Sequence, residues 1–275
     1  MKGKVYLVGA GPGDPELLTL KALRLLRTAE AVLHDDLVGP EILRFVSPAA
    51  QIHNVGKRSG RKKIRQEEIN FLMIELAASG LDVVRLKSGD PLIFGRAGEE
   101  IDALRRAGIA CEIVPGVTSA LGAAAATQIP LTHRQASHAL VLITGHQAFE
   151  SNPSEWSKFV GSGVTLVIYM PGQNYADLAD RLISAGLERE LPCAVISQAT
   201  TEHQQVHRTS IADLPRAPRL ASPTLLVVGE VVRLADPAVL LEQSMMVGST
   251  TGNELSAVSV LPQVKGSSFE EESIR

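Results

Sequence analysis

The sequence predicts an α/β fold in two domains, with a mostly parallel sheet in the first domain and a mixed sheet in the second. Three observations predict it. Short apolar runs alternate with stretches of helical periodicity over residues 4–126, a rhythm typical of parallel sheets. This alternation of strands and helices is interrupted at the polar stretch 128–137, which favours a domain boundary. A second set of strand-like runs follows, and its last two have no long helix between them.

The first domain, residues 1–132, is expected to alternate strands with helices. Its strands are short apolar runs, which we place at 4–9, 31–34, 51–55, 82–87 and 111–116. Its helices carry apolar residues three and four positions apart, as the leucines of 15–29 do. We place these helices at 15–29, 40–46, 66–79, 98–107 and 119–126.

The second domain, residues 133–240, is expected to hold one long helix at 175–186. We place its strands at 139–145, 163–172, 192–197, 204–211 and 222–232. Because no long helix separates the last two runs, they are expected to form an antiparallel pair that finishes a mixed sheet. Residues 241–275 are rich in Ser, Thr and Gly and lack sustained periodicity, so they are expected to be a disordered tail.

Composition excludes several classes of partner. The net charge is −3 and only 4% of residues are aromatic, so the sequence favours neither a cationic grip on nucleic acid nor a base-stacking platform. Cys111 and Cys193 are far apart and the histidines lack ligand spacing, so we expect no metal site. No apolar run approaches the length of a membrane span. We therefore expect a cytoplasmic protein that acts on a small molecule, with no nucleic-acid or membrane partner.

The opening loop, VGAGPGDPELLTL at 8–20, looks at first like a phosphate cradle. A dinucleotide fingerprint would need Gly or Ala at position 14, and a P-loop would end in Gly-Lys-Ser/Thr. Asp14 followed by Pro15 instead resembles a helix N-cap and its first residue. The loop is therefore expected to approach a ligand that lacks phosphate. A tight turn that binds nothing is the alternative.

Two further loops carry concentrated charge. In RLKSGDPLIFGRAGEE, at 85–100, Asp90 follows a strand and two glutamates begin a helix, which favours a cationic or polar ligand at that sheet edge. The alternative is that Asp90 is only a turn residue and that Glu99 and Glu100 only favour the helix start. GKRSGRKKIR, at 56–65, suggests contact with substrate carboxylates or phosphates, or else a solvated run of charge.

Taken together, nine motifs in order resemble the tetrapyrrole methylase family over about residues 3–235. They are VGAGPGDPELLTL, HDDLV, GKRSG, QEEIN, VVRLKSGDPLIFGRAGEE, VPGVTSALGAAAATQIPLTHR, TGH, TLVIYM and SPTLLVVGEVV. The resemblance implies two α/β domains with a deep cleft between them. It also implies S-adenosylmethionine as co-substrate, a homodimer, and no metal.

The resemblance also implies an activity, the double C-methylation of uroporphyrinogen III to precorrin-2 for sirohaem or cobalamin synthesis. A later precorrin intermediate is the alternative substrate, although GKRSG and QIPLTHR favour the first. Because the first strand begins near Lys4, we expect ring oxidation and metal insertion to need separate proteins.

By motif, the resemblance assigns residues to three groups. Acid, base and other catalytic roles fall to Asp35, Lys57, Arg96 and Glu99. Substrate contacts fall to Lys57, Arg96 and Arg134. Cofactor contacts fall to Pro12, Ser88, Gly89, Asp90, Ile93, Thr118, Ser119, Met170 and Ala199.

Overall fold

The computed structural model describes residues 2–56, 64–145 and 156–235, and the first sheet is built from five parallel strands. Its spatial order is β3-β2-β4-β1-β5. The strands are β1 (Val5–Gly9), β2 (Ala31–His34), β3 (Gln51–Asn54), β4 (Val83–Lys87) and β5 (Cys111–Val114). All pairings in this sheet are parallel, so the predicted parallel sheet is confirmed, and all five strands point their carboxyl ends to one edge.

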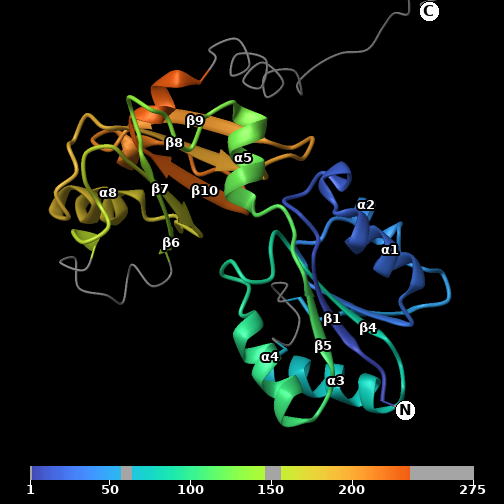
Figure 1. Cartoon of the computed structure of the whole chain (residues 1–275). Helices are drawn as coiled ribbons and strands as arrows, with labels where there is room; N and C mark the ends of the chain where they lie inside the picture. The colour runs from blue at the N-terminus through green and yellow to red at the C-terminus, as the bar shows by residue number, and fades with distance from the viewer. Residues whose placement is uncertain (1, 57–63, 146–155, 236–275) are drawn as a thin grey trace, which may run out of the picture.

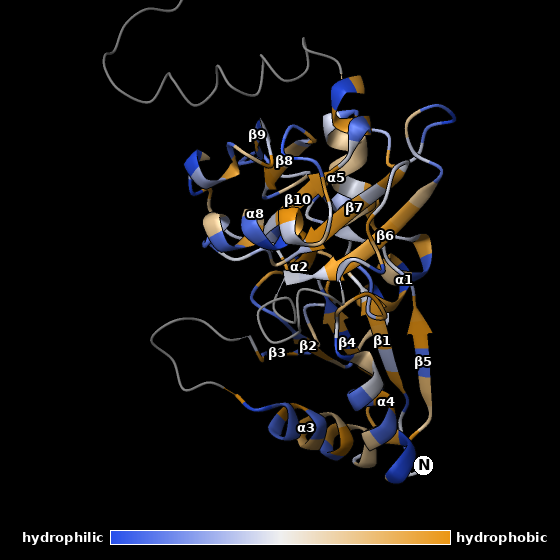
Figure 2. Ribbon diagram, turned by 90° about the vertical axis from the view of Figure 1, so that its left-hand side faces the viewer, coloured by the Kyte–Doolittle hydropathy of each residue, from blue (hydrophilic) through white to orange (hydrophobic). Residues whose placement is uncertain are grey.

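Helices cover both faces of this sheet (Figure 1). One face packs against α3 (Gln66–Ala78) and α4 (Ala97–Arg106), and the other packs against α1 (Leu20–Thr28) and α2 (Pro40–Leu43). Each face has its own cluster of buried apolar side chains. In Figure 2 the strands are mainly hydrophobic, whereas α3 and α4 also carry hydrophilic residues. Burial of strand side chains by helices on both faces explains why these strands read as continuous apolar runs.

The second sheet is mixed, as predicted, but its strand order differs from the expected one. The order is β6-β7-β10-β8-β9. Its strands are β6 (Ala139–Thr144), β7 (Val164–Tyr169), β8 (Pro192–Ser197), β9 (Gln205–Ser210) and β10 (Thr224–Val228). The prediction that the last two runs pair with each other is wrong, because β8 lies between β9 and β10 and is antiparallel to both. Among the described strands of this sheet, β6 and β7 are parallel and the other pairs are antiparallel.

Among the described residues, two α-helices pack against the second sheet. One face packs against α8 (Tyr175–Ser184). The other packs against α5 (Ser119–Thr127), the helix that follows β5 of the first sheet, and Figure 1 shows α5 beside β10. The chain therefore reaches the second sheet before the polar stretch at 128–137.

Two predicted helices are shorter than expected. The stretch 15–29 is divided into the 3₁₀ turn η1 (Pro15–Leu17) and the helix α1, because Leu18 is extended and the Thr19 hydroxyl accepts a hydrogen bond from the Ala22 amide as a new N-cap. The helix expected at 40–46 has only four residues. Among the described residues, no helix combines the length and apolar character needed to cross a membrane. The predicted tail, 241–275, lies outside the described residues, and the domain limits 1–132 and 133–240 stay a prediction.

A small charge network outside the core makes stability depend on pH. The Glu112 carboxylate on β5 forms ion pairs with Lys21 of α1 and with Lys4. Hydrogen bonds from these two lysines, Lys21 first, lower the pKa of Glu112 from its usual 4.5 to about 2. A carboxyl whose pKa is lowered by folding stabilises the native state above its unfolded pKa, and this stabilisation disappears as the pH falls through the native pKa.

We therefore expect Glu112→Gln to destabilise the protein at pH 7 but not at pH 2. The difference in free energy of unfolding between wild type and variant should disappear as the pH falls from about 4.5 to about 2, and it should be smaller in high salt. Urea unfolding at a series of pH values measures it. Glu188→Gln, at an exposed position, is the control, and a difference between wild type and Glu112→Gln that does not change with pH would contradict this account.

Candidate active site

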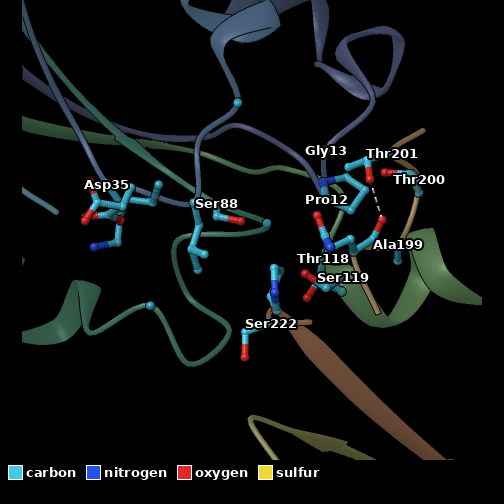
Figure 3. A pocket seen from close by; sticks show the side chains of 18 of the residues that line it. Pro12, Gly13, Asp35, Ser88, Thr118, Ser119, Ala199, Thr200, Thr201 and Ser222 are labelled. Atoms are coloured by element: carbon cyan, nitrogen blue, oxygen red, sulfur yellow. Dashed lines mark hydrogen bonds between the residues drawn. The ribbon is translucent and has the colours of Figure 1, made fainter. Parts of the chain in front are cut away.

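A cleft of about 1000 Å³ lies between the carboxyl edge of the first sheet and the second sheet. Its walls come from the segments that follow β1, β2, β4 and β5 and from the ends of β7, β8 and β10. Figure 3 shows Asp35 at one end of the cleft, Pro12 and Ala199 at the other, and Ser88 between them. The edge at which open α/β sheets bind their ligands is therefore the edge that faces the second sheet.

The opening loop enters the cleft by close backbone contacts. Gly11 and Gly89 exchange backbone hydrogen bonds of 3.2 and 2.7 Å, and both have positive φ, 75° and 67°, where glycine is favoured. The Asp14 side chain accepts a hydrogen bond from the Glu16 amide (2.8 Å), with Pro15 as the first residue of the turn. The predicted N-cap is confirmed, and the Asp14 carboxylate takes a donor that an anion would need.

The loop after β4 is fixed by Asp90. Its carboxylate accepts hydrogen bonds from the amides of Leu92 (2.8 Å) and Gly116 (3.0 Å), so the side chain joins the loops that follow β4 and β5. Further along, Phe94 and Arg96 adopt left-handed conformations with φ of 54° and 57°, which are uncommon for residues other than glycine. Asp90 is thus a turn residue that also lines the cleft.

The second sheet contributes Tyr169 at the end of β7. Its hydroxyl lies 2.6 Å from the Thr118 hydroxyl and accepts a hydrogen bond from the Ala120 amide (3.1 Å) at the start of α5. Burial raises the pKa of Tyr169, and its ring centroid is 4.9 Å from that of Phe94. This residue therefore ties together a loop of the first sheet, the start of α5 and the second sheet.

Two other segments also meet across the cleft. The Asp14 amide donates a hydrogen bond to the Thr200 hydroxyl (3.0 Å), and a Cβ on Gly13 would lie 2.6 Å from Cγ2 of Thr201. A side chain at position 13 would therefore push the opening loop away from the segment after β8. Figure 3 shows Pro12 and Gly13 beside Ala199, Thr200 and Thr201.

At the other end of the cleft, the Asp35 carboxylate forms an ion pair with the buried guanidinium of Arg85. Its Oδ1 accepts a 2.6 Å hydrogen bond from Nη2 of Arg85, and its side chain is 30% exposed. Arg85 is itself only 2% exposed. The cleft thus contains a carboxylate that is partly open to solvent and is fixed by a charge-assisted hydrogen bond from a buried guanidinium.

The structure brings most of the predicted site residues together. All nine residues predicted to contact the cofactor line the cleft, as do Asp35 and Arg96. Glu99 lies beside the cleft and binds the Arg96 guanidinium through two hydrogen bonds of 2.7 Å. Lys57 lies outside the described residues, and Gly56 just before it lines the cleft.

Arg134 does not join this group. It is exposed, in a turn closed by hydrogen bonds between His133 and Ser137, and it does not line the cleft. Its assignment to the substrate therefore rests on the resemblance alone. Among the residues that the structure describes, no group of three or more His, Cys, Asp or Glu side chains is placed to hold a metal ion.

Among the residues that line the cleft and were not assigned by sequence reasoning are Arg85, Lys87 and Tyr169. A signal for the first two was present, because both charges sit two residues apart in VVRLK, on the same face of a strand that is otherwise apolar. Charges on a face that packs against helices must find buried partners. Tyr169 had no such signal, because a tyrosine at the end of an apolar strand is ordinary.

Comparison with known proteins agrees with this architecture. Residues 4–215 match the model of the family described as Tetrapyrrole (Corrin/Porphyrin) Methylases. The chain is 46% identical over 246 residues to a uroporphyrinogen-III C-methyltransferase of Paracoccus denitrificans, covering 88% of this chain and 85% of that protein. It is 46% identical over 235 residues to siroheme synthase 2 of Aeromonas hydrophila, covering 85% of this chain and 50% of that protein, so it spans about half the length of that relative.

A solved structure has the same fold. It is a uroporphyrin-III C-methyl transferase from Thermus thermophilus in complex with S-adenyl homocysteine, with a TM-score of 0.74 and 39% sequence identity. The match covers 84% of this chain and all of that one. Since the family model spans most of the sequence and the relatives match both sheets, this chain belongs to the tetrapyrrole (corrin/porphyrin) methylase family.

Proposed function

We propose that this chain is an S-adenosylmethionine-dependent C-methyltransferase that methylates uroporphyrinogen III twice to give precorrin-2. The observation that carries the proposal is the convergence of all nine predicted cofactor contacts on one cleft. They come from segments as distant in the sequence as Pro12 and Ala199. The Paracoccus relative, which this chain matches over most of its length, is named uroporphyrinogen-III C-methyltransferase.

The cleft fits a methyl donor that has no phosphate. Asp14 and Asp90 already bind the backbone amides of Glu16, Leu92 and Gly116, amides that an anion would otherwise engage. The predicted contacts are mainly small, apolar or hydroxyl-bearing side chains, which suit an adenosine and a thioether chain. When bound, S-adenosylmethionine supplies an electrophilic methyl group to a ring carbon, which must then lose a proton.

We propose the following roles for the protein's own residues. The nine cofactor contacts hold the donor in line with the ring carbon, and positioning of this kind is worth about 7–11 kcal/mol. Arg96 and Arg134 bind acidic side chains of the tetrapyrrole, Arg96 with its fork oriented by Glu99. Asp35 and Lys57 take part in proton transfer.

A single-turnover assay with labelled S-adenosylmethionine and uroporphyrinogen III tests the proposal. Transfer of two methyl groups to each substrate molecule is the expected result. Transfer only to a later precorrin intermediate would assign the chain to another activity of the same family. Binding of S-adenosylhomocysteine with no transfer to any tetrapyrrole would contradict the proposal of an enzyme.

The setting of this activity is proposed on the same grounds. We propose that the chain acts as a homodimer in the cytoplasm and supplies sirohaem or cobalamin synthesis. We also propose a division into an N-terminal domain, 1–132, and a C-terminal domain, 133–240. Sedimentation at several protein concentrations tests the homodimer.

A glycine on α5 offers a test of the cofactor end of the cleft. A Cβ at Gly122 would lie 2.5 Å from Cγ and 2.8 Å from Cβ of Pro12, so Gly122→Ala must displace the opening loop. We expect the dissociation constant for S-adenosylhomocysteine to rise about tenfold, or about 1.4 kcal/mol. Isothermal titration calorimetry measures it.

The control for this variant is Gly98→Ala. Gly98 is also in a helix, and nothing lies within 4 Å of a Cβ built there. Alanine should therefore stabilise α4 by up to about 1 kcal/mol and leave ligand affinity unchanged. Equal affinities for Gly122→Ala and wild type would show that the opening loop does not contact the cofactor.

A further inference from the structure

The carboxylate of Asp35 is fixed on one side by Arg85. Asp35 directly follows β2 and lines the cleft, and its side chain is 30% exposed. Its Oδ1 accepts a 2.6 Å hydrogen bond from Nη2 of Arg85, and among the described residues no donor is found for Oδ2. One oxygen is therefore held by the protein, while the other remains available to a bound molecule.

The Arg85 guanidinium is itself held in one orientation. Its Nε donates to Oε1 of Glu100 (3.0 Å), and its Nη1 donates to the backbone carbonyls of Leu86 (3.3 Å) and, more weakly, Leu33 (3.5 Å). Arg85 is 2% exposed, so a rotation of the planar group would leave buried donors without acceptors, which is costly. Leu33 belongs to β2, two residues before Asp35. The guanidinium therefore contacts both the strand that precedes Asp35 and the Asp35 side chain.

The buried charges beside Arg85 balance one another. Glu100 of α4 is fully buried, and its Oε1 also accepts hydrogen bonds from Nζ of Lys87 (3.1 Å) and Nε2 of Gln66 (3.2 Å). The Lys87 ammonium is 3.0 Å from Oε2 of the same carboxylate. Since Lys87 compensates the charge of Glu100, the charge of Arg85 is compensated by Asp35. Removal of the guanidinium would leave the Glu100–Lys87 pair intact and Asp35 in contact with solvent, so no isolated buried charge would result.

We propose that Arg85 is a positioning residue for proton transfer, which holds the Asp35 carboxylate so that its other oxygen takes the proton lost by the methylated tetrapyrrole. The inference rests on the proposed function, and Glu100 contributes by orienting Arg85. A bond forms between the Asp35 oxygen and the hydrogen, and the bond between the ring and that hydrogen breaks. Its electron pair returns to the ring and neutralises the positive charge. The proton passes to water when the product leaves, and no oxidant or reductant is required.

A loss of positioning should lower kcat and spare binding. The Arg85 side chain is only 3% exposed, so it acts through Asp35 and not on the substrate itself. Arg85→Met should lower kcat for methyl transfer to uroporphyrinogen III about 10- to 100-fold, with little change in KM for the tetrapyrrole. The dissociation constant for S-adenosylhomocysteine should stay near that of wild type, because Asp35 lies at the end of the cleft away from Pro12 and Ala199 (Figure 3).

A double-mutant cycle separates positioning from a merely structural role. Asp35→Asn should lower kcat by at least about 100-fold. Because Arg85 acts through Asp35, adding Arg85→Met to Asp35→Asn should lower kcat by no more than about twofold further. Losses that multiply in the double variant overturn the proposal, and so does a folded Arg85→Met enzyme with near wild-type kcat. Near wild-type kcat in Asp35→Asn also overturns it, because Asp35 is then not the proton acceptor.

Two further variants complete the experiment. Arg85→Lys keeps the charge but lacks the fork that binds Glu100 and Asp35 together, so its kcat should lie between those of Arg85→Met and wild type. The same cycle with Arg85→Lys tests the proposal if Arg85→Met does not fold. Arg181→Met removes a partly buried arginine that pairs with Asp177 outside the cleft, and it should leave kcat unchanged. Absence of methyl transfer in the wild type, with S-adenosylhomocysteine still bound, would instead contradict the proposed function.

Discussion

Replacing Glu100 with alanine is expected to lower the free energy of unfolding by about 3–5 kcal/mol. The substitution leaves Arg85 and Lys87, which are 2% and 4% exposed, without the carboxylate that both of them bind. Asp35 is the remaining anion of the cluster, and it contacts only Arg85 of the two. Since domains of this kind are stable by about 5–15 kcal/mol, the loss is large. Urea unfolding at pH 7 measures it.

The neighbouring residue supplies the matched control. The Glu99 side chain is 51% exposed and pairs with Arg96 at the surface, so Glu99→Ala should cost no more than about 1 kcal/mol. Similar losses for the two variants would show that the buried cluster contributes nothing beyond a surface pair.

The pH dependence of the Glu100→Ala variant has a definite sign. Without Glu100, which raises the pKa of Lys87, burial and Arg85 lower that pKa further. Above this native pKa the folded variant has released its proton, whereas the unfolded chain still holds one. Stability therefore rises with pH in that interval, and the difference from wild type should shrink toward alkaline pH.

The fold was largely predictable because the strands of the first sheet are buried on both faces. A run such as VYLVG lacks the polar positions that an amphipathic helix would show, so it is not mistaken for one. The helices α3, α4 and α5 likewise fall within a residue or two of the predicted ranges. Errors arose where local signals compete. Thr19 looks like a helical residue in a leucine-rich stretch, but its hydroxyl caps a new helix. The place of β8 between β9 and β10 depends on long-range pairing, which spacing does not encode.

The candidate site was predictable in part for a related reason. Glycine and proline mark loops, so the loops at 8–20 and 85–100 could be found from the sequence. The ion pairs that Glu100 forms with Arg85 and Lys87 could not be located from the sequence so easily. Glu100 looks like a favourable charge in the first turn of a helix, and only the packing of α4 against β4 shows that its side chain is fully buried. A charge is assigned to the surface or the interior by tertiary contacts, not by its neighbours in the sequence.

Arg96→Ala is expected to reduce methyl transfer at low tetrapyrrole concentration by at least about 100-fold, with little change in cofactor affinity. The Arg96 side chain is 48% exposed at the edge of the cleft, and its Nε and Nη2 each lie 2.7 Å from a Glu99 oxygen. The guanidinium is thus oriented before the substrate arrives, which reduces the entropy lost when it binds a carboxylate. Initial rates and calorimetry with S-adenosylhomocysteine measure the two effects separately.

Backbone geometry allows a sharper control at this position. Arg96 has φ 57° and ψ 20°, a conformation that any residue with a Cβ adopts at a cost of about 1–2 kcal/mol. Arg96→Ala keeps this cost, whereas Arg96→Gly removes it, so the glycine variant should be more stable than the alanine variant and equally deficient in transfer. Arg96→Lys keeps the charge without the fork and should fall between alanine and wild type. Equal losses of transfer and of cofactor affinity in Arg96→Ala would place this residue in the cofactor subsite instead.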